Sequence, residues 1–215
     1  MNTNIKPFYI YTERNSLYIK NINESSERLA SNIYIYSANI DKNNNIHILA
    51  IDNFGKLLHI FNNNGIWKKK IIRKYFNTTK NIQDMRVYIL NDYFNVFIVE
   101  RYPLDDNQFK ISHINFNISN YSVFRHTIDK VFKDELSIYK LNIDELSNIV
   151  FQYKTIDILS RDTSYNTIIF NSISRKWITS IPLIRNNKIY LNEKNISSNI
   201  KSDILEYCYS IKYKL

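Results

Sequence analysis

The chain has 215 residues, which suits one large domain or two small ones, and 44% of them are hydrophobic, so a packed core is expected and wholesale disorder is excluded. The formal net charge is +9. Apart from one dense run at residues 67–74, the positive residues are scattered, which is typical of a solvated Lys-rich surface.

The sequence carries no signal for secretion or membrane insertion. The N-terminus lacks a charged head followed by an apolar stretch, and no segment approaches the roughly 18 uncharged apolar residues of a transmembrane helix. The single cysteine, Cys208, cannot form an intramolecular disulfide and is expected to be a small buried hydrophobic residue. We therefore expect a cytoplasmic protein.

Short strands are predicted along the whole chain. Tyr, Phe and abundant Ile occur in short apolar runs, many of which alternate with polar residues as on a pleated sheet. Asn, Asp and Ser separate the runs and supply most of the turns. Helical periodicity is weak, and it is faintly visible only at residues 25–30 and 127–136. The predicted strands lie within residues 6–13, 16–22, 32–40, 45–51, 56–61, 85–90, 95–100, 109–116, 136–143, 148–154, 166–172, 176–181 and 187–192.

Gly55 and Gly65 are the only two glycines in the chain. Their spacing matches neither a dinucleotide-binding nor a phosphate-binding glycine loop. Each instead ends a short break, DNFG or NNNG, that separates two apolar runs, as in a β-hairpin. We interpret both glycines as hairpin residues.

A degenerate repeat of about 50 residues spans residues 33–183. Asp41, Asn91 and Asp144 each follow an apolar residue and precede, by four positions, an Asn that opens an apolar strand. We expect these short polar side chains to cap the turn between the first two strands of each copy, because they can accept hydrogen bonds from free backbone N–H groups. A ring of acids that binds a cation is the alternative, and the Asn in the second copy weakens it.

The second half of each copy also recurs. An aromatic residue lies seven positions after an apolar one in all three copies, at Trp67, Tyr121 and Trp177. His59 and His113 occupy equivalent places in the first two copies. Each copy thus reads as four strands joined by short turns, within residues 33–74, 85–129 and 136–183.

Four-stranded antiparallel units of this length, repeated without helices between them, resemble the blades of β-propeller proteins. The resemblance covers residues 31–184 and includes the D-x-x-x-N hairpin and the late aromatic residue. The chain lacks the Trp-Asp, kelch and Gly-rich signatures, so no subfamily is assigned. The resemblance implies an all-β fold, a single β-propeller domain over residues 1–215.

The two ends of the chain decide the expected number of blades. Residues 8–30 read as a partial blade, and residues 186–215 supply further terminal strands. Four blades result if the two ends share one blade, and five, which we favour, if each end makes its own. Pairing of N- and C-terminal strands would remove exposed sheet edges. Alternatively, the chain does not close alone and pairs with a second copy.

Candidate sites are few. The sequence contains no catalytic motif and no cofactor motif. No metal site is expected either, because His59 and His113 would be too far apart on adjacent blades to share an ion unless they face the central channel. Trp67, Tyr121 and Trp177 are candidates for a repeated recognition surface, with packing between blades as the alternative. A basic cluster beside Trp67 is a candidate polyanion site and consists of Lys68, Lys69, Lys70, Arg73 and Lys74.

These observations favour a non-enzymatic binding or scaffold module that mediates protein-protein interaction or assembly. The first alternative is a lectin-like propeller with carbohydrate sites at the aromatic residues between blades. The second is polyanion or nucleic-acid binding through residues 68–74. The expected partner is a protein or a second copy of the chain, and no cofactor or membrane span is expected.

Overall fold

The computed structural model describes residues 8–179, apart from 22–24, 64, 135–136 and 158, together with the backbone of β16 (Ile184–Arg185) and β17 (Lys188–Ile189). Every regular element in these residues is a β-strand, and every strand pair is antiparallel. The predicted all-β class is therefore confirmed. No helix among the described residues is long and apolar enough to cross a membrane.

The first two sheets are simple meanders in which sheet order follows chain order. The first sheet consists of β1 (Phe8–Glu13), β2 (Ser16–Asn21) and β3 (Glu27–Ala30). The second consists of β4 (Ile33–Ile40), β5 (Ile46–Asp52), β6 (Lys56–Asn63) and β7 (Ile66–Lys74).

The remaining large sheet has eight strands but divides naturally into two meanders. The two meanders are connected through β11 and β13, which share only the pair Phe132–Lys154. Lys154 directly follows the residues of β13 that pair with β12. One meander consists of β8 (Ile82–Leu90), β9 (Tyr93–Tyr102), β10 (Asp105–Asn117) and β11 (Val123–Phe132). The other consists of β12 (Tyr139–Ile143), β13 (Ile149–Ile156), β14 (Thr163–Asn171) and β15 (Lys176–Thr179).

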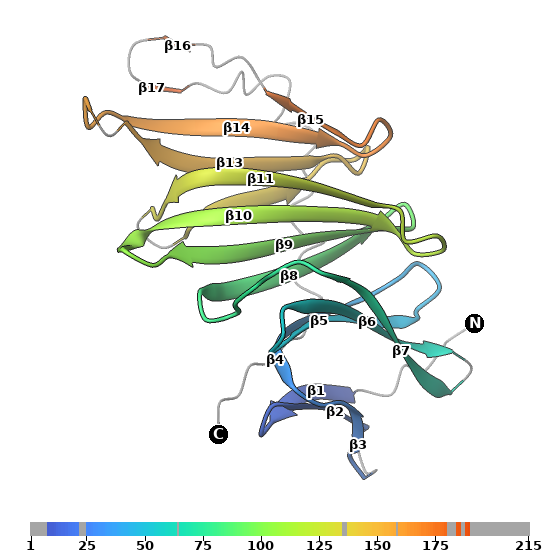
Figure 1. The fold of residues 1–215 in the computed structure, drawn as a ribbon. Coiled ribbons are helices and arrows are strands. Elements are labelled where there is room, and N and C mark those ends of the chain that lie inside the picture. Colours follow the sequence, from blue (N-terminus) through green and yellow to red (C-terminus); the bar gives the residue numbers. More distant parts are fainter. Residues whose placement is uncertain are drawn as a thin grey trace.

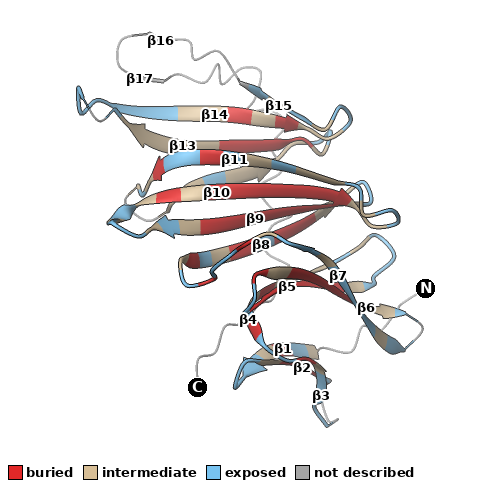
Figure 2. Cartoon of the chain, viewed as in Figure 1, coloured by how far each residue is buried: buried red, intermediate tan, exposed pale blue. Residues whose placement is uncertain are grey.

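These sheets and meanders stack face to face in chain order (Figure 1). An apolar layer that contains Leu17 and Ile48 joins the first sheet to the second. A layer with Leu49 and Phe94 joins the second sheet to β8–β11, and a layer with Phe97 and Phe151 joins β8–β11 to β12–β15. Because the middle strands have neighbours on both faces, β5 and β9 are buried almost throughout instead of alternating (Figure 2).

The described sheets do not close into a ring. Strands β1–β3 pair only with one another, and the first sheet and β12–β15 lie at opposite ends of the stack (Figure 1). The predicted pairing between N-terminal and C-terminal strands is absent from the described residues, where β16 pairs only with β17. The other residues of the predicted terminal strands at 186–215, Cys208 among them, lie outside the described part.

Both segments with faint helical periodicity contain strands. Residues 27–30 form β3, and most of residues 127–136 belong to β11. Strand β11 has an extra residue between Ile128 and Val131, where Lys130 has a positive φ of 52°. This bulge separates two buried apolar residues by three positions, which imitates the spacing on one face of a helix.

Candidate functional site

The aspartates at the first turns of the second sheet and of β12–β15 are turn caps. Asp41 Oδ1 accepts backbone N–H groups of Asn43 and Asn45, each at 2.8 Å. Asp144 Oδ1 accepts the corresponding N–H groups of Leu146 and Asn148, at 2.9 and 2.7 Å. The capping predicted for these two residues is therefore confirmed.

The corresponding turn in β8–β11 is built differently, and the capping predicted for Asn91 is wrong. Strands β8 and β9 pair up to Leu90 and Tyr93, so the turn contains only Asn91 and Asp92. These residues have φ angles of 50° and 64°, as in the tight hairpins that favour Asn in the left-handed region. A two-residue turn leaves no room for the longer capped loop.

A chain of hydrogen bonds runs through the layer between the second sheet and β8–β11. His47 and His59 are buried, and their Nδ1 and Nε2 atoms lie 2.9 Å apart. His47 Nε2 lies 3.2 Å from Asp41 Oδ2, and His59 Nδ1 lies 2.7 Å from the hydroxyl of Tyr121. With His59 neutral and its Nδ1 accepting from Tyr121, His59 Nε2 donates to His47 Nδ1, and His47 Nε2 donates to Asp41.

The next layer contains a related arrangement around His113, which is fully buried. Its Nδ1 accepts the indole N–H of Trp177 at 3.2 Å, and its Nε2 lies 3.1 Å from Asn95 Oδ1. Asn115 also donates to Asn95 and accepts the Arg175 guanidinium at 2.8 Å. In each of these two layers, a hydrogen bond thus joins a histidine of one meander to an aromatic residue of the next.

Burial sets the pKa values of His59 and His113. It lowers the pKa of His59 to about 3, with further lowering by the nearby His47 and Lys70. It also lowers the pKa of His113 to about 3, with a smaller contribution from His126. Both imidazoles are therefore neutral at physiological pH and serve as structural hydrogen-bonding groups between sheets. No group of three metal-ligating side chains is arranged to hold an ion within the described residues.

The three predicted aromatic positions fall into two environments. Tyr121 contacts a histidine of the preceding sheet, and Trp177 contacts a histidine of the preceding meander, as described above. Trp67 packs against the layer between the first two sheets and also lines an open cavity. Of the three, Trp67 therefore has the surroundings of a binding residue.

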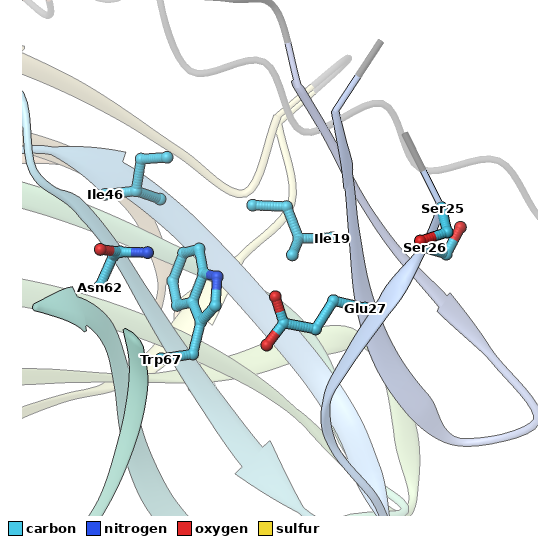
Figure 3. A pocket seen from close by; sticks show the side chains of 7 residues that line it. All are labelled: Ile19, Ser25, Ser26, Glu27, Ile46, Asn62 and Trp67. Carbon is cyan, nitrogen blue, oxygen red and sulfur yellow. The ribbon is translucent and has the colours of Figure 1, made fainter. Parts of the chain in front are cut away.

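The cavity lies between the first and second sheets and has a volume of about 630 Å³ (Figure 3). This volume is in the range of small-molecule sites in proteins. Strands of both sheets and the segment before β3 supply its lining, which consists of Ile19, Ser25, Ser26, Glu27, Ile46, Asn62 and Trp67. We call this cavity the Trp67 pocket.

Two polar side chains flank the indole ring in the Trp67 pocket. Figure 3 shows Trp67 between Asn62 and Glu27, with the Asn62 amide nitrogen turned toward the ring. Asn62 Oδ1 accepts the Gly65 N–H at 2.8 Å, which fixes the amide with its nitrogen facing the cavity. Ser26 Oγ accepts the hydroxyl proton of Tyr11 at 2.9 Å. The pocket thus offers an aromatic face, an amide donor, a carboxylate acceptor and hydroxyl groups.

Most of this lining was missed by the sequence prediction. Glu27, Ser25 and Ser26 lie in the segment with faint helical periodicity, and no repeat marks them because the first sheet has only three strands. The four residues of β3, ERLA, show no alternation of polar and apolar side chains, so the sequence gives no strand signal there.

The predicted basic cluster lies on β7, one of the two edge strands of the second sheet. Its members do not share one face. Lys69 pairs with Ile60, which belongs to the layer on the first-sheet side, whereas Lys70 pairs with His59 on the opposite face. The ammonium group of Lys70 lies 3.7 Å from the ring centre of Tyr121.

The chain was also compared with known proteins. No protein-family model matches it, and no curated protein matches it.

Proposed function

We propose that this chain is a non-enzymatic binding module, in which blade-like sheets of the β-propeller type form a scaffold for protein interaction or assembly. Three apolar layers and two sets of buried hydrogen bonds connect the sheets, which gives the scaffold the rigidity that binding surfaces need. The buried histidines support the lack of a catalytic role, because their ring nitrogens are engaged between sheets and their pKa values are far below neutrality.

The Trp67 pocket supports carbohydrate as one ligand class. A sugar has an apolar face that can lie on an indole ring and hydroxyl groups that both donate and accept hydrogen bonds. Glu27 can accept such hydroxyl protons, and the Asn62 amide can donate to a hydroxyl oxygen. The observation that carries this proposal is the position of Trp67 between these two polar side chains (Figure 3).

Glycan-array screening of the full chain, followed by calorimetric titration of the best ligand, tests the proposal. We expect Trp67→Ala to weaken binding by about tenfold or more and Glu27→Gln to weaken it severalfold, because they remove the aromatic face and the acceptor charge. Glu27 is exposed, so its substitution leaves folding intact. Trp177→Phe is the matched control and should leave binding unchanged, because Trp177 contacts His113 in another layer.

Two results would contradict the carbohydrate assignment. The first is a bound glycan whose affinity is the same in the wild type, Trp67→Ala and Glu27→Gln. The second is failure of the folded chain to bind any glycan on the array. Protein interaction would then be the remaining proposed function, and it can be measured independently with a peptide ligand.

A further inference from the structure

Strand β7 presents a long edge without a partner. Eight of its nine residues, Ile66–Lys74, pair with β6 on one side, with a bulge at Ile72, and no other described strand pairs with it. All of its residues except Trp67 and Ile72 are exposed. The unpaired N–H and C=O groups of such an edge can add another strand by main-chain hydrogen bonding.

The same strand carries a dense positive charge without acidic partners. No ion pair among the described residues includes any of its five basic side chains, Lys68, Lys69, Lys70, Arg73 and Lys74. A second copy of β7 would bring another five cations against these, so pairing between two copies is strongly disfavoured. An acidic strand would be attracted instead.

The positions of the lysines favour a strand over a flat polyanion. Lys68 and Lys70 pair with Phe61 and His59 on one face of the sheet, and Lys69 pairs with Ile60 on the other. A strand added to this edge also alternates its side chains between the two faces, so its carboxylates can meet cations on both. Ile71 is 55% exposed and offers an apolar contact between the charged residues.

The aromatic residues nearby argue against single-stranded nucleic acid as the ligand. Base stacking needs an open aromatic face. The Lys70 ammonium lies over the ring of Tyr121, whose hydroxyl is hydrogen-bonded to His59, and Trp67 packs between the first two sheets. Of these two aromatic residues, only Trp67 keeps an open face, in the Trp67 pocket, and binding of a single strand uses several aromatic side chains on which successive bases stack.

We propose that the edge of β7 binds an extended acidic segment of a partner protein as an additional strand. Main-chain hydrogen bonds supply the pairing, and the lysines on both faces select Asp- and Glu-rich segments. The edge shares Trp67 with the Trp67 pocket, because Trp67 is the second residue of β7, but main-chain pairing along the edge requires no pocket ligand.

The proposal is tested by measuring the binding of a synthetic peptide to the full chain. The peptide repeats two Glu and two Val residues, so that each face of the added strand carries carboxylates. We expect the peptide to bind and to protect backbone N–H groups of β7 from hydrogen exchange. A peptide with the same side chains but N-methylated backbone amides should bind about tenfold more weakly or not at all, because it cannot donate main-chain hydrogen bonds. The triple variant Lys68→Glu, Lys69→Glu, Lys74→Glu should lose binding to a similar extent.

A matched variant, Lys20→Glu, Lys80→Glu, Lys133→Glu, changes the net charge equally at three exposed lysines outside β7 and should retain peptide binding. Equal binding of the N-methylated peptide would overturn the proposal, as would equal losses in the two triple variants. In competition against labelled peptide, a single-stranded oligonucleotide that displaces the label at a lower concentration than unlabelled peptide does would also overturn the proposal. It would identify a nucleic-acid surface. Protein folding is checked in each variant by its circular dichroism spectrum.

Discussion

His113 shows how one buried residue makes the fold sensitive to pH. The indole N–H of Trp177 can only donate, so Nδ1 of His113 must remain an acceptor, and a proton added there would oppose the indole N–H. The other ring nitrogen, Nε2, faces Asn95 Oδ1 and carries the imidazole proton. The neutral ring satisfies both neighbours, and the charged ring does not.

We predict that the free energy of unfolding decreases as the pH falls below about 6.5. The pKa values of His59 and His113 are about 3 in the folded protein, against 6.5 for an unperturbed histidine, so the unfolded state binds more protons between these limits. Each histidine contributes a slope of up to about 1.4 kcal/mol per pH unit, and the loss of stability levels off below the folded pKa. Urea unfolding over this pH range measures the slope.

The variant His113→Gln isolates this contribution. A glutamine side chain can accept from Trp177 and donate to Asn95 but does not titrate, so the slope should decrease by about 1.4 kcal/mol per pH unit. His126→Gln is the control, and it should change the slope less because His126 is only half-buried. Identical slopes in His113→Gln and the wild type would show that His113 does not couple folding to pH.

The repeat in the sequence located these residues but not their contacts. Spacing alone placed His59 and His113 at equivalent positions, and it did the same for Tyr121 and Trp177. The hydrogen bonds, however, join a histidine of one meander to the aromatic residue of the next, 62 and 64 residues further along the chain. Aligning copies shows which positions correspond, but the stacking of neighbouring sheets decides which positions meet.

At the level of strands, the period of side-chain alternation was sufficient to predict the all-β class. Alternation is a local property, because successive side chains point to opposite faces whatever the sheet packs against. It failed where a bulge changed the period, as at Lys130 in β11, and where a strand was very short, as in β3. The turn at Asn91 was misread because its length is set by strand pairing, which the sequence of one strand does not reveal.

The two glycine hairpins allow a direct comparison of backbone strain and steric exclusion. Gly55 and Gly65 have φ angles of 78° and 84°, which disfavour other residues. A Cβ atom on Gly55 would lie 1.9 Å from the carbonyl oxygen of Phe76, whereas one on Gly65 would have no atom within 4 Å. The segment after β7 is held against Gly55, whose carbonyl accepts the N–H groups of Tyr75 and Phe76.

We therefore predict unequal effects of alanine at these positions. Gly65→Ala should lower the free energy of unfolding by about 1 kcal/mol through its backbone conformation alone. Gly55→Ala should lower it by about 3 kcal/mol or more, because the residues around Phe76 must also move away from β5 and β6. Urea unfolding of the two variants provides the measurement. Equal losses would mean that the short distance between Gly55 and the Phe76 carbonyl adds no steric cost to Gly55→Ala.

For the whole molecule, the described sheets form a linear stack in which stability depends on nearest neighbours. The second sheet and β8–β11 each have neighbours on both faces. The first sheet and β12–β15 each have one such neighbour among the described residues. The propeller pattern of the sequence could not reveal this arrangement, because closure depends on long-range pairing of the chain ends and not on the repeated unit.

This arrangement predicts that damage to the last layer remains local. Phe151 is fully buried between β8–β11 and β12–β15, and replacing a buried Phe by Ala costs about 3–5 kcal/mol. In Phe151→Ala, amide hydrogen exchange should accelerate in β12–β15 while β4–β7 keeps its protection. Phe94→Ala, in the layer between the second sheet and β8–β11, is the comparison and should accelerate exchange in the strands on both sides of it. In a closed ring every sheet has two neighbours, so uniform acceleration across all sheets in Phe151→Ala would indicate a ring instead of an open stack.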